Sequence, residues 1–281
     1  MAESELKTRV ISAVFFVIIL FSCVFLSEYT LAALLVFISI TGVFEMASMA
    51  RNQGLIVLKI PAIAGTVICF GTAIAFTIAY LSVGFRSSDL FVALSVFAIW
   101  LVLTMIYAMI VINEKNVESL ALTVFTVFYL ALPMSLLLSL AADDKTGDFV
   151  PWRVMFLFFF MWASDTGAYF SGRFFGKHKL FERLSPKKTI EGFIGGLLTS
   201  MLVGLAGWKF FGTSTWYLWS LAGALLAVAG TCGDLFESMF KRRFGVKDSG
   251  RIMPGHGGVL DRFDSTFLAA PVYWIVSNLL F

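Results

Sequence analysis

Apolar runs of about 18 or more residues recur along nearly the whole chain of 281 residues. Runs of this length are typical of helices that cross a bilayer, and each such helix satisfies its own backbone hydrogen bonds inside the hydrocarbon. The composition agrees, because 59% of the residues are hydrophobic and 14% are charged, which excludes an ordinary soluble domain. The sequence therefore predicts an all-α polytopic integral membrane protein.

The apolar runs predict a bundle of about nine transmembrane helices, at 10–27, 29–50, 60–83, 90–112, 120–141, 152–172, 190–211, 216–238 and 264–281. The first run lacks the small-residue cleavage site of a signal peptide and is expected to be retained. The helices before residue 150 carry little charge, whereas charge gathers after it. We therefore expect 1–150 to be a scaffold of about five spans and 151–281 to hold the chemistry in about four.

Basic residues are distributed unevenly between the two expected sides of the membrane. With the N-terminus inside, the inside segments hold all 21 Lys and Arg residues except Arg86, Lys145, Arg153 and Lys209. The positive-inside rule then predicts a cytoplasmic N-terminus, with both basic segments of the second half on the cytoplasmic side. The net charge is only +3, and no nucleic-acid partner is expected.

The first polar region, WASDTGAYFSGRFFGKHKLFERLSPKKTIEG, places Asp165 in an otherwise apolar span. Such an acid indicates function unless it only hydrogen-bonds to a neighbouring helix, and both interpretations stay open. Further along, Ser185 is expected to cap the seventh helix, with Pro186 at its first position. Lys187 and Lys188 would then complete an anion site suited to phosphate, the alternative being an ordinary lysine-rich loop.

The second polar region, GDLFESMFKRRFGVKDSGRIMPGHGGVLDRFDS, brings acids to the ends of two helices. Asp234, Ser238 and Lys241 share one face of the eighth span, because they are spaced i, i+4 and i+7. Asp261 and Asp264, spaced i and i+3, likewise share a face at the start of the ninth.

A divalent cation is the object that best explains these acids. Carboxylates from two helix ends suit Mg²⁺, which prefers oxygen ligands and recruits phosphates. The predicted ligands are Asp234, Asp261 and Asp264, and the cations around them in the sequence are Lys241, Arg242, Lys247, Arg251 and Arg262. The competing interpretation is mutual neutralisation by salt bridges at the membrane surface.

The glycines around His256 leave amides free to face an anion, and His256 either contacts a phosphate or only fixes its loop.

The run SMFKRRFGVKDSGRIMPGHGGVLDRFD, residues 238–264, resembles the signature of the CDP-diacylglycerol synthases, also called phosphatidate cytidylyltransferases. The shared pattern is Ser, Lys-Arg, Lys-Asp, Pro-x-His-Gly-Gly and Asp-Arg-x-Asp at fixed spacing. The segments SDTGAYFSGRFFGKHKL and SPKKTIEG also resemble family segments, so the likeness covers about 152–281. The first five spans match only as generic hydrophobic helices.

The resemblance implies a membrane nucleotidyltransferase of phospholipid biosynthesis, placed in a bacterial inner membrane or its equivalent. Its substrates would be CTP and phosphatidic acid, its cofactor Mg²⁺ with K⁺ as a possible second cation, and its active site would lie at the cytoplasmic ends of the C-terminal helices. A homodimer is also compatible with the resemblance.

The resemblance also assigns roles to individual residues. It implies metal binding by the three predicted ligands and phosphate contacts by Ser238, Lys241 and Arg242. The other substrate-binding positions that match its motifs are Asp165, Ser185, Lys187, Lys188, Lys247, Asp248, His256 and Arg262.

Two alternative functions are a CTP-dependent polyprenol or phytol kinase and, in a different class, a cation transporter. The spacing of HGG and DRFD disfavours the first, and the gathering of the acids at one face disfavours the second.

Overall fold

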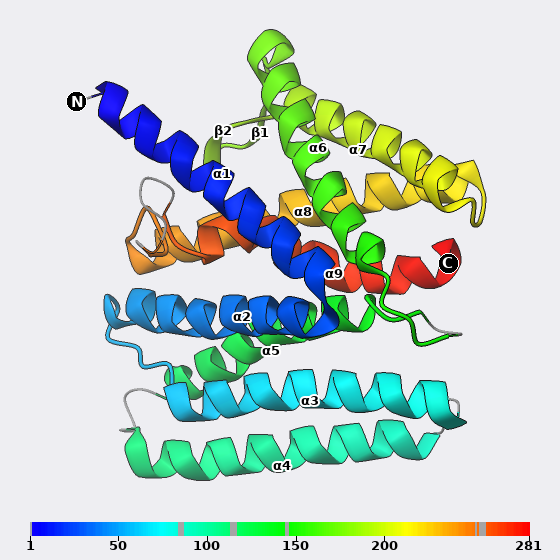
Figure 1. Ribbon diagram of the computed structural model, residues 1–281. Helices are drawn as coiled ribbons and strands as arrows, with labels where there is room; N and C mark the ends of the chain where they lie inside the picture. The colour runs from blue at the N-terminus through cyan, green and yellow to red at the C-terminus, as the bar shows by residue number, and fades with distance from the viewer. Residues whose placement is uncertain (1, 84–86, 113–116, 144–145, 251, 253–256) are drawn as a thin grey trace. The chain divides into compact units, whose positions relative to one another are not determined.

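The computed structural model describes residues 2–83, 87–112, 117–143, 146–250, 252 and 257–281. These residues form nine helices and one antiparallel pair of strands (Figure 1). In chain order the elements are α1 (Ala2–Leu26), α2 (Glu28–Arg51), α3 (Lys59–Val83), α4 (Ser87–Val111), α5 (Glu118–Ser139), α6 (Pro151–Phe175), β1 (Lys179–Phe181), β2 (Ser185–Thr189), α7 (Ile190–Phe211), α8 (Trp216–Phe244) and α9 (Leu260–Leu280). The predicted all-α class is confirmed, and a helix lies at each predicted span.

Within the described part of the chain, six helices are long and apolar enough to cross a membrane: α2, α3, α4, α5, α7 and α8. The first helix adds a shorter apolar stretch, Val10–Leu26. By length and composition, α6 and α9 are outside this set. The polytopic membrane class is therefore confirmed. Of the nine predicted spans, six lie in helices that are long and apolar enough to cross a membrane, among the described residues.

Two helices of the second half extend beyond their apolar runs. The eighth was predicted to end at 238 but continues to Phe244, and the ninth begins at Leu260 rather than at 264. Gly245 follows α8 with φ of 68°, the left-handed conformation in which many helices end. Hydropathy marks only the apolar part of a helix, so charged turns at its ends go unnoticed.

The described chain divides into two compact units. The first comprises Met1–Pro151 together with Phe244–Arg262, and the second comprises Trp152–Arg243 together with Phe263–Phe281. In the first unit α5 packs against α2 and α3, and α4 packs against α3. The core between them is apolar and contains the buried side chains of Leu31, Leu35, Val127, Leu130 and Met134.

Glycines allow close helix packing in the second unit. A Cβ at Gly167 of α6 would meet the side chain of Thr199 and would lie 2.7 Å from the carbonyl oxygen of Gly195, both on α7. The Thr199 hydroxyl also donates to the carbonyl of Ala163 at 2.8 Å. Small residues of this kind let two backbones approach, as in many membrane helix pairs. Gly167 therefore allows close packing of α6 against α7.

A β-hairpin stands where the start of the seventh helix was expected. The strands β1 and β2 pair antiparallel, and Thr189 caps α7 by accepting the N–H of Gly192 at 3.1 Å. The prediction that Ser185 caps this helix is therefore wrong, because Ser185 lies in β2. The Lys179 ammonium donates to the Pro186 carbonyl at 2.7 Å, a contact that favours the hairpin over a longer helix.

Candidate active site

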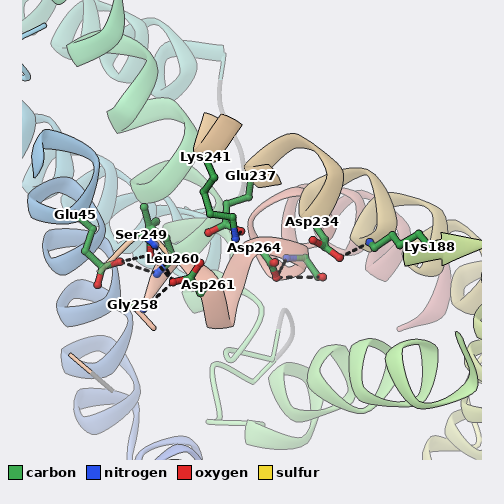
Figure 2. Close-up of polar contacts among 11 residues, drawn as sticks. Glu45, Lys188, Asp234, Glu237, Lys241, Ser249, Gly258, Leu260, Asp261 and Asp264 are labelled. Carbon is green, nitrogen blue, oxygen red and sulfur yellow. Dashed lines mark hydrogen bonds and ion pairs between the residues drawn. The ribbon is translucent and has the colours of Figure 1, made fainter. Parts of the chain in front are cut away.

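Three carboxylates gather in the second unit. Asp234 and Glu237 lie one turn apart on α8, and Asp264 lies on α9. One oxygen of each carboxylate lies within 4.8 Å of the others, and we call these three residues the acidic cluster (Figure 2). Glu237 is 2% exposed, whereas the other two are half-buried.

The separation of these acids is set by a contact between α8 and α9. A Cβ at Gly233 would meet the backbone carbonyl of Asp264 and would lie 3.1 Å from the Cα of Ser265. Backbone cannot move aside as a flexible side chain can, so a larger residue at 233 would push the helices apart. Asp234 follows this glycine directly, and the contact therefore holds it near Asp264.

Two lysines pair with the acidic cluster. The Lys188 ammonium, on β2, forms an ion pair with Asp234. The Lys241 ammonium lies 2.6 Å from Glu237 Oε2, at i,i+4 on α8. Asp264 accepts the N–H of Ser265 at 2.6 Å. Cations from two elements thus face one group of carboxylates.

The charges of the acidic cluster suit a divalent cation. Two unit charges 4.8 Å apart repel by about 3.5 kcal/mol at an effective dielectric constant of about 20. Three ionised carboxylates exceed the charge of two lysines by one, so further positive charge stabilises the group. All donors are oxygens, which Mg²⁺ prefers. The donor set therefore fits Mg²⁺.

Asp261 makes different contacts, in the first unit. Its Oδ2 accepts the N–H groups of Ser249 at 2.9 Å and Gly258 at 2.7 Å, and it lies 2.9 Å from the Ser249 hydroxyl. The predicted metal ligands were Asp234, Asp261 and Asp264. Among the described residues, the three carboxylates that lie close together are instead those of Asp234, Glu237 and Asp264.

Comparison with known proteins shows to which family the chain belongs. A sequence profile of the Cytidylyltransferase family matches residues 7–280. The chain belongs to the cytidylyltransferase family. This match covers both units and includes every residue of the acidic cluster.

Several curated proteins from staphylococci are similar to part of the chain. The chain is 53% identical over 121 residues to proteins named phosphatidate cytidylyltransferase from Staphylococcus haemolyticus and Staphylococcus aureus, and 54% identical to the one from Staphylococcus epidermidis. Each match covers 42% of this chain and 46% of the relative. About half the length of these relatives is therefore matched.

The other predicted site residues occupy several elements. Within the second unit, Asp165 on α6 is exposed and interacts electrostatically with Asp264. Ser238 is half-buried and Arg242 is exposed, both on α8. In β2, Ser185 is half-buried and Lys187 is exposed. The predicted residues in the first unit are Lys247, Asp248 and Arg262, all exposed. His256 and Arg251 lie outside the described residues.

Two buried acids, Glu237 and Glu45, were not among the predicted site residues. Glu237 carries a local signal, because it follows Asp234 by three residues and must share its helix face. Glu45 carries a weaker one: it is an acid in the otherwise apolar α2, and nothing nearby in the sequence indicates its partners.

Proposed function

We propose that the chain is a phosphatidate cytidylyltransferase of phospholipid biosynthesis, which condenses CTP with phosphatidic acid to give CDP-diacylglycerol and pyrophosphate. The observation that carries the proposal is a lysine-paired acidic cluster in a membrane protein of the cytidylyltransferase family. The printed name of the staphylococcal relatives supports the choice of substrates.

The proposed reaction asks the protein for position and charge rather than for a protein nucleophile. The phosphate oxygen of phosphatidic acid is already ionised at neutral pH and attacks the α-phosphorus of CTP. The bond from that phosphorus to the bridging oxygen of the β-phosphate breaks, and pyrophosphate leaves. The largest contributions are then the alignment of two phosphates and the stabilisation of charge on their oxygens.

The acidic cluster would hold Mg²⁺ through its three carboxylates. When bound, this ion supplies electrostatic stabilisation to phosphate oxygens. Lys188 and Lys241 form ion pairs with Asp234 and Glu237, and their ammonium groups would be available to phosphate if those carboxylates held a cation. The two lysines would in this way exchange a carboxylate partner for a phosphate partner.

The family resemblance supports further proposals about residue roles, membrane topology, a second cation and assembly. Ser238 and Arg242 would contact phosphate, and Asp261 would join the metal ligands. The active site and the N-terminus would face the cytoplasm. A K⁺ ion beside Mg²⁺ and a homodimer belong to the same group of proposals.

The test is product identification with the purified chain in detergent. With phosphatidic acid, CTP and Mg²⁺, we expect CDP-diacylglycerol by mass spectrometry and one pyrophosphate for each lipid formed. EDTA should stop both. A phosphorylated lipid together with CDP would indicate a kinase, and an unchanged lipid pool would leave the transfer reaction without support.

A further inference from the structure

A buried acid lies in α2, in the half of the chain for which the sequence predicts a scaffold. Glu45 is 5% exposed and interrupts an otherwise apolar helix. A carboxylate in such a place is costly unless it is hydrogen-bonded, and it indicates a function by default. The proposed chemistry assigns Glu45 no role.

The contacts of Glu45 are at the beginning of α9. The N–H of Val259 donates to Oε1 at 2.9 Å, and the N–H of Leu260 donates to Oε2 at 2.9 Å. The first amides of a helix have no acceptor within the helix, and its N-terminal end favours a negative charge. Glu45 therefore caps α9 from another helix, with both of its oxygens engaged.

Ser249 links this carboxylate to a second one. Its hydroxyl lies 3.0 Å from Glu45 Oε2 and 2.9 Å from Asp261 Oδ2. Asp261 Oδ2 in turn accepts the N–H of Gly258, three residues earlier in the chain, and this is the spacing of a capping box. The two carboxylates thus bind Ser249, which precedes the His-Gly-Gly segment in the sequence, and Gly258, the last residue of that segment (Figure 2).

Two glycines show how tightly the chain surrounds Glu45. A Cβ at Gly258 would lie 2.5 Å from both carboxylate oxygens of Glu45, and a Cβ at Gly250 would lie 2.8 Å from its Cδ. Both distances are shorter than real Cβ contacts allow. The second glycine of the Gly-Gly pair is therefore required by the approach of its backbone to Glu45.

We infer that Glu45 is a positioning residue, which fixes the first turn of α9 and so fixes where that helix places the carboxylate of Asp264, one turn further along. The consequence for turnover rests on the proposed function, whereas the anchoring of α9 does not. In a catalytic group, a displacement of about 1 Å lowers the rate by about 100-fold.

The test compares Glu45→Gln with wild type in the full-length chain in detergent. Glutamine keeps the shape but has one acceptor oxygen, so one α9 amide loses its partner. We expect hydrogen exchange at Val259 and Leu260 to rise about tenfold or more. We also expect kcat to fall about 10- to 100-fold with the KM for CTP changed less than about threefold. Glu28→Gln, an exposed carboxylate of the same helix, is the matched control and should change neither.

Gly258→Ala provides an independent variant, because its Cβ intrudes on Glu45 without changing any charge. The same pattern of faster exchange and lower kcat would support the inference. Unchanged exchange in Glu45→Gln would overturn it, as would faster exchange with an unchanged kcat. If the wild-type chain transfers no cytidylyl group, the proposed function fails, and the exchange data alone then decide whether Glu45 anchors α9.

Discussion

Glu237→Gln removes one negative charge from the acidic cluster while keeping the shape of a side chain that is 2% exposed. Glu237 was not predicted as a site residue, so the variant tests what the structure adds. The proposal gives Glu237 a direct contact with Mg²⁺, because its carboxylate lies within 4.8 Å of those of Asp234 and Asp264. An amide oxygen in its place carries no formal charge.

The expected magnitude follows from that lost contact. An interaction with a charged group contributes about 1.5–3 kcal/mol, which corresponds to about 10- to 150-fold in an equilibrium constant. The two like-charge repulsions of about 3.5 kcal/mol each that involve Glu237 also disappear with the carboxylate, and they are strongest in the metal-free protein, where no cation screens them. Repulsion that disappears in the metal-free protein further reduces the relative benefit of binding the ion. We therefore expect Mg²⁺ binding to weaken by at least about tenfold.

The assay is the rate of lipid formation as a function of buffered free Mg²⁺, together with thermal stabilisation by Mg²⁺ in the absence of substrates. For Glu237→Gln both curves should shift to higher Mg²⁺ by the same factor. Glu118→Gln, an exposed carboxylate in the first turn of α5, is the matched control. Unchanged curves for Glu237→Gln would refute its role as a ligand.

Three further predictions concern catalysis, packing and topology. Asp264→Asn and, separately, Asp261→Asn should each remove most activity while leaving a membrane-inserted protein; normal turnover by both variants would contradict the metal role. Gly167→Ala should lower the stability of the chain by about 1–3 kcal/mol, measured as the melting transition in detergent, because its Cβ overlaps α7. Gly71→Ala, with open space around the added Cβ, should leave melting almost unchanged, and equal shifts would argue against the packing explanation. A cysteine placed at Lys187 should react with impermeant reagents only from the cytoplasmic side, and labelling only from the opposite side would reverse the topology.

The helices were predictable because burial in a bilayer needs long apolar runs. The seventh span was predicted at 190–211, and α7 is Ile190–Phe211. The ends beside the site were harder to predict. The last turn of α8 contains Lys241, Arg242 and Arg243, whose charge hides a continuing helix from any hydropathy argument.

The hairpin escaped prediction because its causes are not local. Ser185 followed by proline is a sound signal for a helix start, but strand pairing between Lys179 and Thr189 and the bond from Lys179 to Pro186 outweigh it. Glu191 adds a further contact by accepting the N–H of Lys177 at 3.0 Å. Tertiary contacts of this kind override a cap signal read from five residues.

The acidic residues were likewise predictable where the signal is local in the sequence and not where their partners are distant. Asp234 and Asp264 were predicted because carboxylates at the ends of two helices suit a divalent cation, and Glu237 was accessible to the same argument from helical spacing. The partners of Glu45 were not, because 214 residues separate it from Val259. Only the folded chain brings α2 and the start of α9 together within the first unit.

The most direct test of the proposed activity follows the two ends of the CTP triphosphate. The purified chain is incubated with phosphatidic acid, Mg²⁺ and CTP labelled at either the α- or the γ-phosphorus, with Asp264→Asn as the inactive control. Cytidylyl transfer predicts α-label in the lipid and γ-label in pyrophosphate. Label from the γ-position in the lipid, or no label in the lipid from either position, would contradict it.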